Sequence, residues 1–300
     1  MASLAPLARA LATARARAVA SAIALAAMGL SPLAAVADDG GDQGGASITA
    51  QSSLALRAAP LGLISETDGG YRIPLAFSDA PLFADTYLEP GVSVHLTPSA
   101  ARGGLYLESV PLAILQLRVA AYASSYFGSF GYLHLPADPD DPSSWSLSAL
   151  GGGAAEGERG SGVMLEASAT PRALVGRTVL LAETKLRWAR ASVTQSYYEP
   201  IFDMLLEPSD SYWVTRPTVG RIFALPDRDS WVMAALRWEH GQASGTGVTR
   251  DMAALVGLWS LPWTLRAQGE VTLAIVAGYW VRHPNRAGTV YGASQLSVEW

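Results

Sequence analysis

Residues 270–282 have the sequence EVTLAIVAGYWVR, in which apolar and polar side chains largely alternate. Successive side chains of a β-strand point to opposite faces, so an extended stretch of this kind has one apolar and one polar face. The apolar face holds Val271, Leu273, Ile275, Ala277, Tyr279 and Val281, and the other face holds Glu270, Thr272 and Arg282. The pattern predicts a long β-strand with two chemically different sides.

Four more stretches repeat this alternation, and clusters of Gly, Pro, Asp and Ser separate them. Their apolar faces begin at Leu115, Leu180, Val232 and Val290. With weaker segments included, the sequence predicts about twelve strands, and a count of ten or fourteen also fits. They lie near residues 52–64, 70–77, 88–97, 104–110, 113–126, 161–170, 177–193, 211–224, 230–240, 251–260, 269–283 and 287–300.

A two-sheet sandwich and a closed barrel both produce such alternation. Strands of globular proteins usually have about 5–6 residues, whereas these segments often run to 10–14 residues. Aromatic residues stand near the segment ends, at Trp188, Trp238, Trp259, Tyr279 and Trp300. Long alternating strands with aromatic ends are typical of membrane-spanning barrels. We therefore expect an all-β, antiparallel, up-and-down transmembrane barrel, with a secreted sandwich that acts as a binding module as the alternative.

The connections between the predicted strands differ in length from one side to the other. Residues 110–112, 170–176, 225–229 and 260–268 form mostly short connections on one side. The two longest connections, 127–160 and 194–210, fall on the opposite side. Bacterial barrels have short periplasmic turns and longer outer loops, so this distribution favours a barrel. The connection 78–87 is the exception, because it is long for a periplasmic turn.

The N-terminal segment predicts export. Residues 1–37 contain no acid, and Arg9, Arg15 and Arg17 precede an apolar run at 18–30. This run is shorter than the roughly 20 residues of a membrane-spanning helix, and the small residues at 35–37 match a cleavage site. We expect a signal peptide at 1–37, a flexible leader at 38–47 and a barrel at 48–300; the alternative for the first segment is a short membrane anchor.

Composition excludes several classes of function. Without residues 1–37 the chain keeps 18 of its 21 basic residues and all 26 acids, a formal charge of 18 − 26 = −8, which argues against a nucleic-acid partner. The chain has no cysteine, so thiol chemistry and disulfides are excluded. After the signal peptide no apolar run reaches the length of a membrane helix; the longest is residues 273–281. We predict no metal site and no cofactor.

Charged residues are confined to the polar faces, which in a barrel face the lumen. The predicted lumen-lining residues are Glu108, Arg118, Glu166, Glu183, Lys185, Arg187, Arg237, Glu239, Glu270 and Arg282, with Glu299 on the same face of the last strand. Acids and bases nearly balance, so they can either cross-link and fill a narrow lumen or line a hydrated channel. A barrel near twelve strands is well below the 16–18 strands of open porins, which favours a narrow channel or a passive structural barrel.

The last ten residues, 291–300, have the sequence YGASQLSVEW. Trp300 is a terminal aromatic residue, and Val298 and Leu296 stand two and four positions before it. This ending resembles the C-terminal signal of Gram-negative outer-membrane barrel proteins, in which phenylalanine is commoner at the last position. The resemblance implies an outer-membrane location, contact with outer-membrane lipid, and recognition of the last strand by the barrel-assembly machinery.

An enzyme is the alternative function. Outer-membrane phospholipases and omptin-type proteases use histidine at the barrel wall or outer rim, and here His240 and His283 are the candidate bases, although neither lies in a matching motif. Such a site would act on lipid or peptide at the outer rim.

The two long connections have different compositions. The connection 127–160 carries an acidic stretch at 138–141, whose spacing matches no Ca²⁺ loop, and a glycine-rich stretch that matches no phosphate loop. The connection 194–210 is unusually apolar, with Tyr197, Tyr198, Phe202, Met204, Leu205 and Leu206. It either enters the barrel mouth as a constriction or plug, forms an outer binding surface, or packs on itself.

Overall fold

The computed structural model describes residues 45–58, 62–75, 80–83, 85–128, 135–146, 149, 159–199, 201–225, 230–265 and 269–300. The predicted signal peptide, residues 1–37, and most of the predicted leader lie outside this part of the chain. No helix among the described residues is long and apolar enough to cross a membrane.

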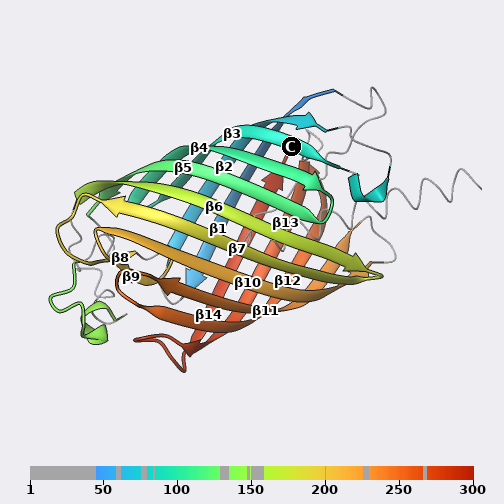
Figure 1. The fold of residues 1–300 in the computed structure, drawn as a ribbon. Helices are drawn as coiled ribbons and strands as arrows, with labels where there is room; N and C mark the ends of the chain where they lie inside the picture. The colour runs from blue at the N-terminus through green and yellow to red at the C-terminus, as the bar shows by residue number, and fades with distance from the viewer. Residues whose placement is uncertain are drawn as a thin grey trace, which may run out of the picture.

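Twelve of the described strands form one closed antiparallel barrel, in which each strand pairs with its two neighbours around the ring (Figure 1). Pairing between the first and the last strand closes the ring. The barrel strands are β1 (Ser47–Ala58), β2 (Gly62–Pro74), β3 (Tyr87–Thr97), β4 (Ala100–Leu112), β5 (Leu115–Phe127), β6 (Arg159–Val175), β7 (Thr178–Ala191), β10 (Ser209–Ala224), β11 (Trp231–Ala243), β12 (Thr249–Leu265), β13 (Gly269–Arg282) and β14 (Val290–Glu299).

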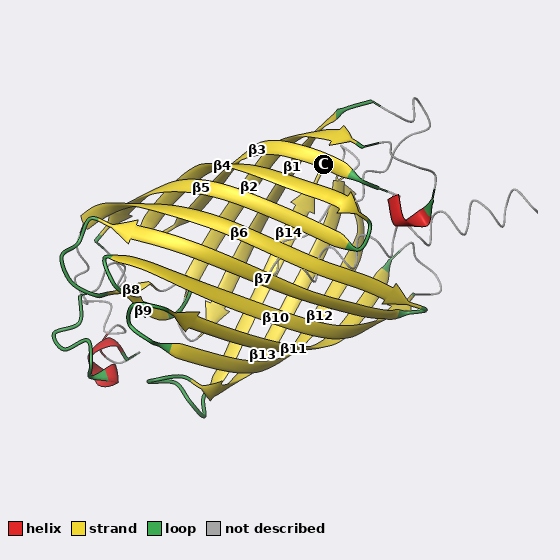
Figure 2. Cartoon of the chain, in the orientation of Figure 1, coloured by secondary structure: helices red, strands yellow, loops and turns green. Residues whose placement is uncertain are grey.

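Four short elements lie between the barrel strands (Figure 2). Strands β8 (Tyr197–Glu199) and β9 (Met204–Leu206) pair with each other as a separate hairpin in the connection between β7 and β10. The 3₁₀ helices η1 (Pro81–Phe83) and η2 (Pro142–Trp145) occupy the connections β2–β3 and β5–β6. We call the end of the barrel that carries β8, β9 and η2 the outer end, because it bears the two longest connections.

The predicted fold class and strand number are confirmed, and a closed ring excludes the two-sheet sandwich. The first two predicted strands were misplaced. The sequence predicted one strand over 52–64, whereas β1 ends at Ala58, before Pro60. The long 78–87 connection holds η1, and Leu82 accepts a backbone hydrogen bond of 2.9 Å from Ala113 in the next turn on that side.

Every barrel strand exposes at least two large apolar side chains, as β4 does with Leu105 and β11 with Leu236, which are 66% and 60% exposed. The alternate positions are buried or half-buried, and in β7 the buried ones include Glu183 and Arg187. A closed sheet satisfies all its backbone hydrogen bonds internally, and an apolar exterior around the whole ring suits lipid. The barrel is therefore a membrane-spanning structure of the outer-membrane type.

The interior is not uniformly polar. Inward side chains of β7 and of β10 to β14 form an apolar cluster on one side of the barrel. It comprises Val179, Leu181, Ile222, Trp231, Met233, Ala235, Met252, Ala254, Val256, Leu258, Ala274, Val276, Trp280 and Ala293. This cluster occupies part of the lumen, so the charged side chains share the remaining space.

Candidate functional site in the barrel interior

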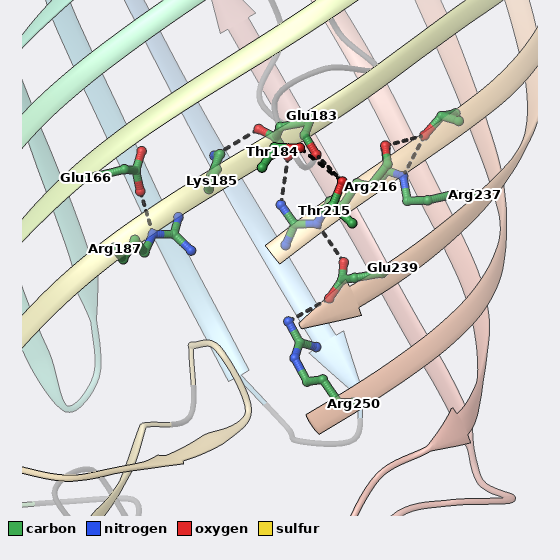
Figure 3. Close-up of polar contacts among 11 residues, drawn as sticks. Glu166, Glu183, Thr184, Lys185, Arg187, Thr215, Arg216, Arg237, Glu239 and Arg250 are labelled. Carbon is green, nitrogen blue, oxygen red and sulfur yellow. Dashed lines mark hydrogen bonds and ion pairs between the residues drawn. The ribbon is translucent and has the colours of Figure 1, made fainter. Parts of the chain in front are cut away.

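A chain of charged groups crosses four neighbouring strands inside the barrel (Figure 3). At its centre Arg216 of β10 binds Glu183 of β7 at 2.9 Å and Glu239 of β11 at 2.6 Å. Glu239 also binds Arg250 of β12 at 2.6 Å, and Glu183 binds Lys185 at 3.0 Å. We call these five residues the Arg216 network. Each of its acids faces two cations, which compensates for the loss of water around the buried carboxylates.

A separate ion pair of the barrel wall contacts the connection between β7 and β10. We call residues 197–199 and 201–206 of this connection the outer hairpin. Glu166 of β6 accepts a hydrogen bond of 2.5 Å from Arg187 of β7. The guanidinium of Arg187 lies 4.2 Å from the ring centre of Phe202 in the hairpin. Arg187 therefore contacts the charged wall and an aromatic ring of the hairpin at once.

Charged and tyrosine side chains on β2 to β5 form a second network. Arg118 binds Asp68 at 2.9 Å and Glu108 at 3.6 Å, and its guanidinium lies 3.9 Å from the ring centre of Tyr106. Tyr87 donates a hydrogen bond of 2.6 Å to Glu108. We call these five residues the Arg118 network. Asp68 lies on β2 and was not predicted as a lumen residue, yet it is the closest acidic partner of Arg118.

Glycine makes room for this second network. A Cβ atom on Gly91 would lie 2.3 Å from the ring of Tyr106, so only glycine allows the ring to lie against the strand at that position. The Tyr106 hydroxyl donates a hydrogen bond of 2.9 Å to Glu89, which also binds Arg72 at 2.7 Å. Because Gly91 has no side chain, the Tyr106 side chain can lie where Glu89 and Arg118 both contact it.

Between the two networks lies a polar cavity of about 180 Å³. Its lining comes from β1 to β7, β10 and β14, and from Ile201 and Phe202 of the outer hairpin. Arg118, Lys185 and Arg187 face it together with acids of both networks. A polar cavity of this size has room for several water molecules or one small polar solute.

The outer hairpin fills the outer mouth of the barrel. Its residues Tyr197, Phe202, Met204 and Leu206 pack in one apolar cluster with inward side chains of the wall. The wall residues in that cluster are Ala100, Tyr106, Ala120, Tyr122, Tyr126, Met164, Ala189, Ala191, Tyr212, Val214 and Ala243. Of the alternatives that the sequence left open for this connection, the structure shows the plug.

A buried polar cluster ties the hairpin to the other outer loops. Asp203 is bound by Arg286, by His283 at 3.3 Å and by the hydroxyl of Tyr198 at 2.7 Å. Burial alone would raise the pKa of Asp203, but the hydrogen bond from His283 and the charge of Arg286 outweigh burial and lower it. We call these four residues the Asp203 latch.

The loop between β5 and β6 joins the same assembly. The rings of Trp145 and His283 lie tilted against each other, with 5.9 Å between ring centres. Asn285 donates a hydrogen bond of 3.1 Å to the carbonyl of Trp145. Three outer loops, far apart in the sequence, therefore close over the barrel as one packed unit.

Most of the predicted lumen residues lie inside the barrel. Glu108, Glu166, Glu183, Arg187, Arg237 and Glu239 are buried, and Arg118 and Lys185 line the cavity. Arg237 donates to Thr218 at 3.3 Å, and Glu270 accepts from Ser260 at 3.0 Å, away from the outer hairpin. Leu296 and Trp300 are exposed, and the backbones of Trp300 and Ala50 exchange two hydrogen bonds. Val298 is half-buried.

Arg282 is a correction. The alternation of β13 placed it in the lumen, whereas the structure exposes it, opposite Asp251 of β12. A register shift between Asp251 and Met252 breaks the alternation there, so Val281 and Arg282 are both exposed. A bulge of this kind re-aims a side chain by adding one residue to one strand.

Sequence reasoning missed Arg216, Arg250 and Asp203. Arg216 precedes Pro217 on a strand whose inward positions mix Tyr212, Val214 and Arg216, so apolar and polar residues do not alternate there. Asp203 lies in a turn of the hairpin, and Arg250 lies near the start of β12. Where the alternation is broken, a residue can be assigned to the inward face only from its cross-strand partners, and these are known only once the register of the two strands is known.

Both candidate histidines have an acidic partner. His240 Nδ1 lies 2.6 Å from Asp251 on the outer face of the wall, and His283 belongs to the Asp203 latch. Among the described residues, no serine or threonine hydroxyl contact is found for either imidazole.

A third histidine has such a hydroxyl contact. His95 Nε2 lies 2.9 Å from Ser93 Oγ, but that hydroxyl donates at 2.5 Å to Asp68, so the imidazole must act as the donor. Ser93 is fully buried and out of reach of a substrate. Within the described part of the chain no group of three or more histidine, aspartate or glutamate residues could hold a metal ion.

Comparison with known proteins finds likeness only at the level of fold. No protein-family model matches the chain, and no curated protein matches it. Among solved structures, the β domain of the Bordetella autotransporter BrkA is 13% identical, with 85% of this chain and 98% of that chain covered and a TM-score of 0.42. The KdgM porin is 6% identical, with 84% of this chain and 98% of that chain covered and a TM-score of 0.37. OmpT of Vibrio cholerae is 8% identical, with 87% of this chain and 98% of that chain covered and a TM-score of 0.36.

Proposed function

We propose that this protein is a narrow channel of the outer membrane for small polar solutes, and that the outer hairpin closes its mouth. The observation that carries the proposal is the polar cavity of about 180 Å³ between the Arg216 and Arg118 networks. A barrel with only a structural role has no need of a polar cavity. A lumen lined by charges of both signs favours small zwitterionic or uncharged polar solutes over ions of one sign.

The closing element is separable from the wall. The hairpin belongs to one connection and is held by side-chain packing, the Asp203 latch and a hydrogen bond of 2.9 Å from Arg57 to Ile201. Its removal would leave all twelve barrel strands in place. Loops of this kind gate access without changing the surrounding scaffold.

Single-channel conductance in a planar lipid bilayer tests this function. The intact protein should open rarely, and a variant in which a short Gly-Ser linker replaces residues 196–207 should show frequent discrete steps. Substitution Arg118→Gln or Arg187→Gln in that variant should change the step size, because both side chains line the cavity. Arg221→Gln, at an exposed position of β10, is the matched control.

The control for folding is heat-modifiable migration on a gel, since a closed barrel resists unfolding in detergent until it is boiled. A folded hairpin-deletion variant that stays silent would refute the channel and favour a passive structural barrel.

The second candidate function is an enzyme at the outer rim, favoured by the 2.6 Å contact between His240 and Asp251. An acid and the histidine that it orients are two of the three members of a nucleophilic triad. If this function holds, His240→Asn should abolish hydrolysis of a phospholipid or peptide substrate, and His283→Asn is the matching test for the second histidine. Equal hydrolysis by the wild type and by both variants, or none by any of the three, would remove the enzyme from consideration.

A further inference from the structure

The outer hairpin brings two acids, Glu199 and Asp203, into the mouth of the barrel. Both side chains are buried, with 2% of each residue exposed. A buried carboxylate is stable only where cations or hydrogen-bond donors replace its water. Asp203 finds them in the outer loops, through the Asp203 latch. The contacts of Glu199 lie instead on the barrel wall and within the hairpin itself.

Glu199 is held loosely. The hydroxyl of Tyr126 on β5 donates to its Oε2 at 3.3 Å, and the backbone N–H of Ile201 donates to its Oε1 at 3.3 Å. Hydrogen bonds to a carboxylate usually measure about 2.5–2.9 Å, so both contacts are long. Burial raises the pKa of Glu199, and the charges of Arg102 and Arg57 offset only part of that rise. A better-placed carboxylate could therefore displace it.

The wall under the hairpin presents guanidinium groups to it. Arg102 of β4 lines a small cavity of about 10 Å³ together with Glu199, and its Nε donates at 3.1 Å to the neutral hydroxyl of Ser124. The ring of Phe202 lies 5.7 Å from the guanidinium of Arg102 and 4.2 Å from that of Arg187. The hairpin thus covers two wall guanidiniums with one aromatic ring and brings a carboxylate beside Arg102.

The small cavities beside the hairpin have more cations than acids on their wall side. In the first, the wall contributes Arg102, and none of the described wall residues of its lining is acidic. A second cavity, of about 50 Å³, is lined by Asp203 of the hairpin and by four charged wall residues, which are Arg57, Arg216, Glu239 and Arg250. If the hairpin withdraws, each cavity loses an acid and keeps all its cations. The open mouth is therefore suited to an anionic group.

We propose that the mouth of the barrel binds the carboxylate group of the solute, and that Glu199 occupies this position while the hairpin is closed. Arg102 and Tyr126 then contact the carboxylate of the solute in place of Glu199. A guanidinium is well suited to this exchange, because its planar set of donors matches a carboxylate. The inference rests on the proposed channel and narrows its solutes to small zwitterions with a carboxylate, of the amino-acid type.

Competition between solute and hairpin has a measurable consequence. A solute that binds only when Glu199 has left shifts the hairpin toward its open position. Hydrogen exchange of residues 197–206 in the full chain reports this shift, with glycine and glycinamide as probes, since glycinamide lacks the carboxylate. Glycine at about 50 mM, a high concentration because so small a solute binds weakly, should raise the exchange rate of the wild type about threefold. Glycinamide at the same concentration should leave it unchanged.

Two variants remove opposite partners of the same contact. Glu199→Gln and Arg102→Gln should each raise exchange about tenfold without solute, because the hairpin loses a charged interaction in both. Glu199→Gln should respond to less glycine than the wild type, since the competing carboxylate is gone. Arg102→Gln should not respond to glycine at all. Glu207→Gln changes an exposed acid next to the hairpin and should behave as the wild type; heat-modifiable migration shows that each variant is folded.

The outcomes separate this site from the channel. Equal responses to glycine and glycinamide, or a glycine response that persists in Arg102→Gln, would overturn the carboxylate site. A glycine response in a protein whose hairpin-deletion variant conducts nothing would keep the site and remove the channel. Frequent conductance steps without any exchange response in the wild type would keep the channel and remove the site.

Discussion

Arg216 is the side chain whose loss should cost the barrel most, because it joins two buried acids. Replacement by methionine keeps the apolar stem but leaves each acid with one ion pair, Glu183 with Lys185 and Glu239 with Arg250. Breaking a buried ion pair by removing one partner costs about 3–5 kcal/mol. Each acid keeps one cation, so we expect the lower end, about 3 kcal/mol, or somewhat more than a hundredfold in the unfolding equilibrium.

The assay is urea unfolding in phospholipid vesicles, followed by tryptophan fluorescence, with Arg221→Met at an exposed position of β10 as the matched control. The control should change the free energy of unfolding by less than about 1 kcal/mol. Replacing all five residues of the Arg216 network, with Arg216→Met, Lys185→Met, Arg250→Met, Glu183→Gln and Glu239→Gln, should recover part of the loss, because no charge of the network remains buried without a partner. A loss below about 1 kcal/mol in the single variant, or no recovery in the five-residue variant, would refute the reasoning.

Two further perturbations test other parts of the structure. Gly91→Ala should destabilise the barrel by about 1–3 kcal/mol in the same unfolding assay, because its Cβ would lie 2.3 Å from the Tyr106 ring; an unchanged midpoint would mean that the ring moves freely. The latch should release in acid: the pKa of Asp203 is lowered in the folded state, so its stabilisation is full above the ordinary value of about 3.9 and is lost as pH falls further. The rate of hydrogen exchange at residues 197–206 should therefore rise below about pH 4, beyond its intrinsic pH dependence. The variant Asp203→Asn should exchange faster already at pH 6 and should show no further rise in acid. Identical protection in both proteins would contradict this.

The faces of the regular strands could be predicted from the sequence. Along β7 a period of two persists from Leu180 to Trp188, and a one-residue shift would turn all the charged side chains toward lipid. The hydrophobic pattern thus specifies which residues are buried without knowledge of the neighbours. The same rule failed at Arg282, because a register shift depends on the pairing of two strands and cannot be seen in the sequence of β13 alone.

The closure of the outer mouth could be predicted only in part. The apolar composition of the connection 194–210 indicated that it must be covered, but the alternatives stayed open. Asp203, Arg286 and Trp145 come from three different loops, and their assembly depends on the barrel bringing those loops together. Polar partners of this kind have no periodicity, so the sequence contains no local signal for them.

The pairing of β1 with β14 has a consequence for how the barrel forms. The hydrogen bonds between Ala50 and Trp300 join residues from the two ends of the described chain. Contacts of such long range require the whole intervening chain to be ordered before they add stability, because the entropy of closing the loop comes first. Until that pairing forms, the sheet has two open edges in an apolar solvent that offers them no partners. The pairing of β14 with β1 is therefore the step that commits the chain to the closed barrel. Until the two edges pair, a nascent barrel needs both of them shielded.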